Sequence, residues 1–530
     1  MLAGVPRVIR VLFEVLAEDL LGRIGRIRTR SGRVAETPLF LPVINPVSQI
    51  IPASWMRSEL KAEAVITNAY IALKRRREEA LEKGVHELIG FDGVVMTDSG
   101  GYQVLEYGDV ETTPEEIALF QEDIETDIAV PLDVPTGLGG REKAEETVEK
   151  TLRNLEKTVR VLESRGERKC LWTAPIQGGL HLDLLRRCAE REREMGFDLF
   201  ALGSPTPLME GYRFDKLFRM IQAARLAIGF GKPLHLFGAG HPMIFPFIIA
   251  LGVDMFDSAS YILYARDDRY MTEGGTIKVD KLDYLPCSCP VCSKLDAEEL
   301  KSLEGEERVR KIATHNLYVC YMEVKRAKQA IRDGRLMELL EARARSHPSL
   351  LQGFVELMRD EELIELMEKH TPLSSRRGLN LYDELSLKRP RVRIARRRLL
   401  ENVFPGKRIR SAILIPETLR PSTSKVEELM EMFDEVLFYG SPYGLIPYGL
   451  RYTYPFSQTN YPRQLIEDRV EEVANLILKQ LKISGCGEAV LVKPRSRYLA
   501  GLESKLLEEL ARRGVVVREV GDLKDLLRRA

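Results

Sequence analysis

Eight short apolar runs, each bounded by turn residues, recur at regular intervals in the first half of this 530-residue chain. Charged stretches with the 3.6-residue periodicity of helices separate most of them, most clearly Glu145–Ser164, Leu182–Met195 and Phe214–Ile228. Strands that alternate with helices in this way form parallel sheets. Eight such units predict an α/β fold, a (β/α)₈ (TIM) barrel. The runs are Pro38–Val43, Ala64–Thr67, Val94–Thr97, Ile128–Leu132, Leu171–Pro175, Leu199–Leu202, Leu234–Phe237 and Val253–Phe256.

The chain is long enough for smaller domains beyond the barrel. Arg269–Val279, with Gly274 and Gly275 at its centre, predicts a β-hairpin, and a helical region follows from about Glu298 to Arg345. Changes in composition place one boundary near residue 345 and another near residue 405. We therefore predict a barrel domain over 1–345, a helical and basic linker domain over 346–405, and an α/β domain over 406–530, the last two forming smaller α+β additions.

Overall charge predicts no class of partner, because 79 Lys and Arg balance 79 Asp and Glu. The uncharged stretch Pro233–Val253 contains three prolines and several glycines, so it reads as strand, loop and short helix rather than a membrane span. Charged residues also interrupt the apolar N-terminal run, which fits neither a signal peptide nor an anchor. We expect a cytoplasmic protein that does not bind membranes.

Aspartates follow predicted strands at the carboxyl ends, where the active sites of barrel enzymes lie. Asp98 follows the third run, and Asp257 ends the eighth. A single aspartate in such a place is often a helix cap or a turn former, but two at one rim suit displacement at the anomeric carbon of a sugar. One carboxylate would form a covalent glycosyl ester while the other handles protons. Asp254, three positions before Asp257, is expected to be structural.

Further polar and aromatic residues at strand ends suit the recognition of a flat base. Asp133 could accept hydrogen bonds from a purine edge, and Gln177 and the backbone amide of Gly203 are candidate donors to a base carbonyl. Tyr102 and Phe237 could stack on the two faces of the base, although ordinary core packing is the alternative.

Three cysteines within six residues, Cys287, Cys289 and Cys292, precede His315 by at least 23 positions. Three thiolates and one imidazole complete the tetrahedral ligand set of zinc, and no coordination position remains open for substrate. The alternative is a group of free buried cysteines with a core histidine. We predict one structural Zn²⁺ per chain.

Positive charge is concentrated between Thr371 and Arg410, where twelve Lys or Arg stand against three acids, a net charge of +9. A solvated face is one interpretation of this segment. The whole chain is neutral, so this positive charge is local and is balanced by acids elsewhere. We therefore favour a surface that contacts the phosphates of a polyanion.

Taken together, these motifs resemble the archaeal tRNA-guanine transglycosylases. The similar stretches are Thr-Asp-Ser-Gly-Gly-Tyr-Gln around Asp98, Pro-Leu-Asp at Asp133, Gly-Val-Asp-Met-Phe-Asp ending in Asp257, and the Cys-x-Cys-x-x-Cys motif with His-Asn-Leu-Tyr at His315. The resemblance covers about residues 1–345 and continues more loosely to the Phe-Tyr-Gly-Ser-Pro-Tyr-Gly stretch near residue 440.

The resemblance implies exchange of guanine in the D-loop of tRNA for 7-cyano-7-deazaguanine, a step towards archaeosine. It implies that Asp98 and Asp257 are the catalytic pair, that Asp133 and Gly203 contact the base, and that the Cys₃His set binds zinc. Both aspartates have been assigned as the nucleophile in this family; we favour Asp257 as the nucleophile and Asp98 as acid and base. The 406–530 domain is then expected to assist in binding tRNA, and the protein to form a homodimer.

Members of the family typically carry a C-terminal PUA domain, and no such module is evident before Ala530. A separately encoded PUA protein is therefore a possible partner. Three other interpretations remain: the paralogous archaeosine synthase, a non-catalytic tRNA-binding subunit, and a zinc-stabilised barrel hydrolase unrelated to RNA. Retention of both aspartates with the full cysteine set argues against the first two, and steeply salt-dependent tRNA binding would argue against the third.

Overall fold

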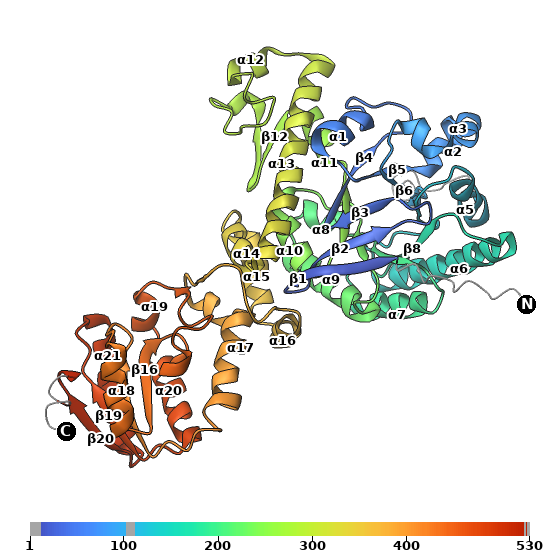
Figure 1. Ribbon diagram of the computed structural model, residues 1–530. Coiled ribbons are helices and arrows are strands. Elements are labelled where there is room, and N and C mark those ends of the chain that lie inside the picture. Colours follow the sequence, from blue (N-terminus) through green and yellow to red (C-terminus); the bar gives the residue numbers. More distant parts are fainter. Residues whose placement is uncertain (1–11, 102–111, 524–525, 527–530) are drawn as a thin grey trace, which may run out of the picture. The chain divides into compact units, whose positions relative to one another are not determined.

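The computed structural model describes residues 12–101, 112–523 and 526 (Figure 1). Its contacts divide the chain into two compact units: the first comprises 1–332 and 336–359, and the second 333–335 and 360–530. The division of the second unit into a linker domain and an α/β domain stays a prediction. In the described part of the chain, no helix is long and apolar enough to cross a membrane.

The predicted (β/α)₈ barrel is confirmed. Its eight strands are all parallel and close in the order β10-β11-β4-β5-β6-β7-β8-β9, so that each strand pairs with its neighbours in the sequence. The strands are β4 (Leu39–Ile44), β5 (Ala64–Asn68), β6 (Val94–Asp98), β7 (Ile128–Ala129), β8 (Leu171–Ile176), β9 (Leu199–Leu202), β10 (Leu234–Leu236) and β11 (Met255–Ser258).

Helices follow the strands and surround the barrel (Figure 1). The three predicted helices are confirmed as α6, α7 and α9, all amphipathic with one face buried. The helices of the barrel region are α1 (Ala53–Leu60), α2 (Ala69–Arg75), α3 (Arg77–Ile89), α5 (Pro114–Asp123), α6 (Arg141–Arg165), α7 (Leu182–Arg193), α8 (Thr206–Glu210), α9 (Phe214–Ile228), α10 (Phe245–Ala250) and α11 (Ser260–Arg266).

Alternation along the strands fills the barrel interior with apolar side chains and then places polar ones above them. Successive residues of a strand face opposite sides of the sheet, so every second residue points inward. Leu39 and Leu41 of β4, Ala64 and Ile66 of β5, Val94 and Met96 of β6, and Met255 of β11 belong to one buried cluster. Continuing each alternation by two residues leads to Asn68, Asp98 and Asp257, which therefore face the carboxyl end of the barrel.

An antiparallel sheet that the apolar runs did not predict precedes the barrel. It consists of β1 (Phe13–Asp19), β2 (Gly22–Arg28) and β3 (Val34–Thr37). Ile27 and Ala35 join the same buried cluster as the lower barrel residues, so this sheet closes the amino end of the barrel. The described interior is thus a packed core that is covered at its amino end and bordered by a cavity at its carboxyl end.

Asp254 holds three elements together beneath the barrel, as its predicted structural role requires. Its carboxylate accepts hydrogen bonds from Arg23 Nε of β2 (2.9 Å), Arg225 of α9 (2.9 Å) and the Leu234 amide (2.8 Å). All three charged side chains are at most 3% exposed. Removing the acid would leave two buried guanidinium groups without their counter-ion.

We therefore expect Asp254→Ala to lower the free energy of unfolding by about 3–5 kcal/mol, measured by denaturant titration. Asp183→Ala is the matched control, because Asp183 forms an exposed ion pair with Arg141 and should contribute less than about 1 kcal/mol. Equal stabilities of the two variants would contradict the structural role of Asp254.

The predicted hairpin is β12 (Arg269–Thr272) with β13 (Gly275–Lys278), paired antiparallel. Helices follow, as the sequence predicted: α12 (Ala297–Ser302), α13 (Gly305–Asp333) and α14 (Leu336–Ala344), then α15 (Pro348–Leu357). In Figure 1 the hairpin and α12 lie beside the long helix α13. This arrangement brings the cysteine segment between β13 and α12 towards His315 on α13.

The second unit has a five-stranded sheet in the order β17-β16-β15-β19-β20, in which only β17 is antiparallel. Alternate residues of β15 enter different cores: Ala412 and Leu414 lie in one cluster, Ile413 and Ile415 in the other. Apolar side chains therefore pack on both faces of the sheet, as in doubly wound folds.

The elements of this unit are α16 (Glu361–Lys369), β14 (Leu379–Asn380), α17 (Pro390–Arg398), β15 (Ser411–Pro416), α18 (Thr423–Met432), β16 (Glu435–Ser441), β17 (Gly444–Pro447), β18 (Thr459–Asn460), α19 (Gln464–Glu467), α20 (Val470–Ser484), β19 (Glu488–Val492), α21 (Ala500–Arg512) and β20 (Val516–Val520).

Candidate active site

A cavity of about 950 Å³ opens at the carboxyl ends of the barrel strands. Six of the seven residues that the sequence singled out for catalysis or base binding line it; the seventh, Tyr102, lies outside the described residues. A cavity of this volume can hold a nucleoside together with neighbouring parts of a larger substrate. The six are Asp98, Asp133, Gln177, Gly203, Phe237 and Asp257.

Asp98 is the last residue of β6 and points into the cavity. Its Oδ1 accepts hydrogen bonds from Asn68 Nδ2 and from the Gly100 amide, both at 2.8 Å. Burial raises the pKa of the carboxyl group to about 7, and the negative charges of Asp257 and Asp133 add to the rise against the two hydrogen bonds. Asp98 can therefore carry or release a proton near neutral pH.

Asp257 lies on β11 and is 7% exposed. Its Oδ1 lies 2.8 Å from His235 Nε2 and accepts a hydrogen bond from the Gly238 amide at 3.1 Å. Asp98 and Asp257 line the same cavity, and the negative charge of Asp257 contributes to the raised pKa of Asp98. The structure thus brings together two acids that are 159 positions apart in the chain.

Asp133 is held by Gln177, whose Nε2 donates to Asp133 Oδ2 at 2.6 Å. The Oε1 atom of Gln177 accepts from the Thr136 amide (3.1 Å) and the Ser204 hydroxyl (3.0 Å), which fixes the orientation of the amide. Burial raises the pKa of Asp133 to about 6, with the hydrogen bond from Gln177 opposing the rise. Gln177 therefore acts mainly on Asp133 in this structure.

Two glycines leave room for this pair. A Cβ at Gly101 would lie 2.1 Å from Asp133 Oδ1, and one at Gly203 would lie 2.2 Å from Gln177 Nε2. The Gly203 amide, which the sequence suggested as a donor to a base, donates to Ile176 O at 3.0 Å, as a strand residue does. The contribution of Gly203 to the cavity is therefore its missing side chain, which leaves room for Gln177.

Sequence reasoning missed Asn68 and His235, which contact the two acids directly. Asn68 directly follows the second run, and His235 lies two positions before Phe237 in the seventh. Asn68 lies in register with Asp98, and His235 lies two positions before Phe237, so each points to the same side of the sheet as a residue that the sequence selected. Asking which polar residues of each run point into the barrel would have found both.

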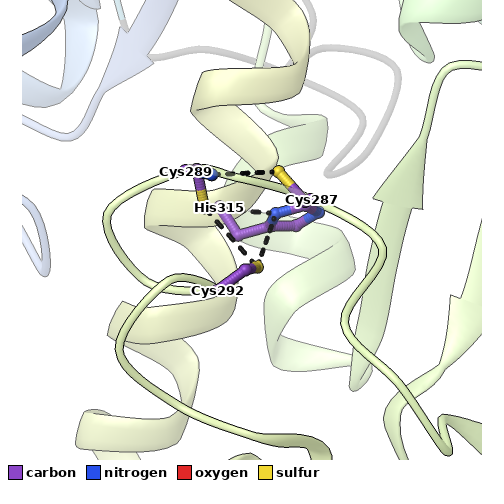
Figure 2. A group of neighbouring side chains, drawn as sticks. All are labelled: Cys287, Cys289, Cys292 and His315. Carbon is purple, nitrogen blue, oxygen red and sulfur yellow. Dashed lines mark hydrogen bonds between the residues drawn. The ribbon is translucent and has the colours of Figure 1, made fainter.

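The four predicted metal ligands come together next to the barrel (Figure 2). The Sγ atoms of Cys287, Cys289 and Cys292 and a ring nitrogen of His315 all lie within 4.8 Å of one another. Cys292 Sγ lies 3.4 Å from His315 Nδ1 and 3.5 Å from Cys289 Sγ. These are close to the edges of a tetrahedron around a metal with bonds of about 2.0–2.3 Å, so the group could hold a metal ion.

Neighbouring groups orient these ligands. His315 Nε2 lies 2.8 Å from Met271 O, a contact that places its proton on Nε2 and leaves Nδ1 directed at the thiols. The Tyr270 ring stacks on the imidazole with centroids 3.6 Å apart, and its hydroxyl lies 3.3 Å from Cys292 Sγ. Asn316 bonds the backbone of Met271, Arg269 and Tyr261. The cluster therefore joins α13 to the hairpin strand β12.

The basic segment is partly neutralised within the second unit. Arg393 pairs with Glu361 and Glu368, Arg397 also with Glu368, and Arg396 with Glu472. Several of its arginines thus serve to pack α17 against α16 and α20. The charge available to a polyanion is smaller than the count over 371–410 suggests.

Comparisons with known proteins agree with the geometry. The model of the family described as "Queuine tRNA-ribosyltransferase" matches residues 19–349, which span the barrel, the cysteine segment and α13. This match covers more than half of the chain.

Relatives extend the similarity into the second unit. The chain is 42% identical to a tRNA-guanine(15) transglycosylase of Aeropyrum pernix over 481 residues, 88% of this chain and 92% of the relative. It is 43% identical to the protein of the same name from Archaeoglobus fulgidus, over 87% of this chain and 90% of the relative. A further protein of that name, from Methanosarcina mazei, is 42% identical over 84% and 87%.

Proposed function

The chain belongs to the queuine tRNA-ribosyltransferase family, a family of glycosyltransferases, and from this premise we propose that it exchanges a guanine of tRNA for a free base. The proposed site is guanine 15, in the D-loop, and the proposed incoming base is 7-cyano-7-deazaguanine. One observation carries the proposal: Asp98 and Asp257 meet in a single cavity that can hold a nucleoside.

The proposed reaction has two displacements at C1′ of the ribose. Asp257 attacks C1′, the bond from C1′ to N9 of guanine breaks, and the leaving base takes a proton from Asp98. The incoming base then gives its N9 proton to Asp98 while N9 attacks C1′, and the ribosyl–aspartate ester breaks to release Asp257. Two inversions retain the configuration at C1′, and Asp98 ends in its initial protonation state.

The surroundings of the two acids favour this division of roles. Asp98, with a pKa of about 7, can be an acid in the first step and a base in the second at neutral pH. Among the described residues, the hydrogen-bond donors to Asp257 reach Oδ1 alone, from groups on β10 and the loop after it. The reverse assignment, with Asp98 as nucleophile, would give the role that requires a carboxylate to a group that is only about half ionised at pH 7.

We propose that Asp133 binds the edge of the base. With a pKa of about 6 it is mostly ionised at neutral pH and can accept hydrogen bonds from the ring N–H and the exocyclic amino group. Phe237 would stack on one face of the base, at about 1–3 kcal/mol, and Tyr102 is proposed for the other. Unpairing and flipping the target nucleotide costs a few kcal/mol, which these contacts would offset.

For the Cys₃His cluster we propose one structural zinc ion. The donor set, the separations of 3.4–3.5 Å and the backbone partner of His315 all suit zinc, and four protein ligands leave no position for substrate. The ion would tie the hairpin to α13 and take no part in the chemistry. We further propose that uncompensated basic residues of the second unit contact tRNA phosphates.

The deciding experiment is guanine exchange on an unmodified archaeal tRNA transcript. We expect radiolabelled guanine to enter the tRNA, and 7-cyano-7-deazaguanine to displace it irreversibly when added later. A transcript in which another base replaces guanine 15 is the matched control and should take up no label. Failure of the wild-type protein to label the unmodified transcript would overturn the proposed function.

A further inference from the structure

His235 is a fully buried histidine whose Nε2 atom lies 2.8 Å from the Oδ1 atom of Asp257. We propose that His235 is a positioning residue, which holds the carboxylate of Asp257 in the orientation that ribosyl transfer requires. This inference rests on the proposed function, because it assigns Asp257 as the nucleophile. It adds a residue that the sequence motifs did not single out.

The barrel places the imidazole directly under the catalytic layer. His235 lies on β10 in register with Ala201 of β9 and Met255 of β11. Met255 belongs to the apolar core inside the barrel, and residues in register on neighbouring strands share a face of the sheet. His235 therefore points inward one layer below Asp257, and its ring centroid lies 4.9 Å from that of Phe237.

The hydrogen bonds of the ring define its tautomer. Nδ1 is buried and has no hydrogen-bond partner among the described residues. A proton on Nδ1 would leave a buried N–H donor unsatisfied, whereas an unprotonated nitrogen there leaves only a lone pair. We infer a neutral imidazole with its proton on Nε2, which donates to Asp257 Oδ1.

Both donors to Asp257 therefore reach the same oxygen. The His235 N–H and the Gly238 amide meet at Oδ1, and none of the described residues donates a hydrogen bond to Oδ2. Oδ2 is then the atom free to attack C1′. When the ester breaks in the second step, negative charge returns to the carboxylate, and donors fixed in advance stabilise that charge.

The test compares variants that keep or remove the donor. His235→Leu fills a similar volume without an N–H group, and His235→Gln places an amide N–H near the position of Nε2. His235→Asn is shorter and places its amide near Nδ1 instead. We expect His235→Leu to lower kcat for guanine exchange about 100-fold, with KM for tRNA and guanine changed less than about twofold. His235→Gln should recover to within about tenfold of wild type, and His235→Asn should not.

A matched control lies at the other end of the same barrel. His86 Nε2 is 3.2 Å from Asp127 Oδ2, outside the cavity, so His86→Gln changes a similar His–Asp contact and should leave kcat nearly unchanged. Thermal unfolding of each variant checks that it is folded. If the leucine variant does not fold, the glutamine and asparagine variants decide.

The outcomes separate the two proposals. Suppose that the wild type exchanges guanine. A kcat of His235→Leu equal to that of the wild type, or equal kcat values of His235→Gln and His235→Asn, would then overturn the role of His235 and leave the proposed function standing. A rise in KM with unchanged kcat would overturn it as well, because that pattern indicates substrate binding rather than positioning. No exchange by any form, wild type included, would overturn the proposed function and this inference with it.

Discussion

Asp257→Asn is expected to reduce guanine exchange on the order of 10⁴-fold or more, to the limit of detection. The amide oxygen is a poor nucleophile, so no ribosyl ester can form. Asp98→Asn is expected to reduce exchange by about 10²–10⁴-fold, because the leaving guanine then lacks its proton donor while the nucleophile remains. The measurement is the initial rate of label incorporation at saturating tRNA and guanine.

The two variants differ in the intermediate that they can form. If tRNA is incubated with enzyme and free base is removed, Asp98→Asn should slowly accumulate a denaturation-resistant adduct between protein and tRNA, and Asp257→Asn should accumulate none. An adduct in Asp257→Asn but not in Asp98→Asn would reverse the two roles. Asp123→Asn, at an exposed aspartate of α5 that pairs with Arg165, is the control and should exchange at the wild-type rate.

The pH dependence is an independent test of the same assignment. Asp98 has a pKa of about 7 in the free enzyme, above the usual value of 3.8, because burial and neighbouring carboxylates disfavour its charged form. The first step needs the protonated form, which is lost as the pH rises through 7. We therefore expect kcat/KM for tRNA to fall above about pH 7 in the wild type, and this limb to be absent in Asp98→Asn.

Much of this site follows from the parity of residues in short strands. Runs such as Val94–Thr97 predict buried strands, and the alternation of β6 leads from Met96 inside the barrel to Asp98 at its mouth. The barrel closure then brings Asp98 to Asp257, because parallel strands all present their carboxyl ends at one rim. The pattern could thus predict which side chains meet, without predicting their hydrogen bonds.

The features that were not predicted have both local and long-range causes. The strand expected over Ile128–Leu132 contains Pro131, which has no N–H group for the ladder, and β7 ends at Ala129. The charge count over 371–410 took no account of Glu368 and Glu472, which approach Arg397 and Arg396 only in the fold. The sheet at the amino end has strands such as Gly22–Arg28, whose arginines conceal the apolar alternation.

Removal of the proposed zinc ion is expected to have the second large effect. Structural zinc contributes apparent free energies of about 10–16 kcal/mol in small zinc-dependent folds, and its ligands here link the loop after the hairpin to α13. We expect metal analysis to find about one zinc per chain. Stripping the ion with a chelator, or introducing Cys289→Ser, should lower the apparent unfolding temperature by roughly 10 °C, if about 5 kcal/mol is lost.

Exchange activity should fall when the proposed ion is removed, even though we assign the ion no part in the reaction. Arg269, Gly275 and Thr276 of the hairpin line the cavity, and the Met271 carbonyl of the same hairpin holds His315. Without the ion, three thiols and an imidazole no longer hold the hairpin against α13, so this wall of the cavity loses its support. Cys320→Ala is the matched control, since it removes a buried thiol of α13 that is not a ligand and should retain zinc and activity. Folded, metal-free protein with unchanged stability and exchange would refute the structural role of zinc, whereas a loss of exchange that readdition of zinc restores would show that the cluster supports the cavity wall.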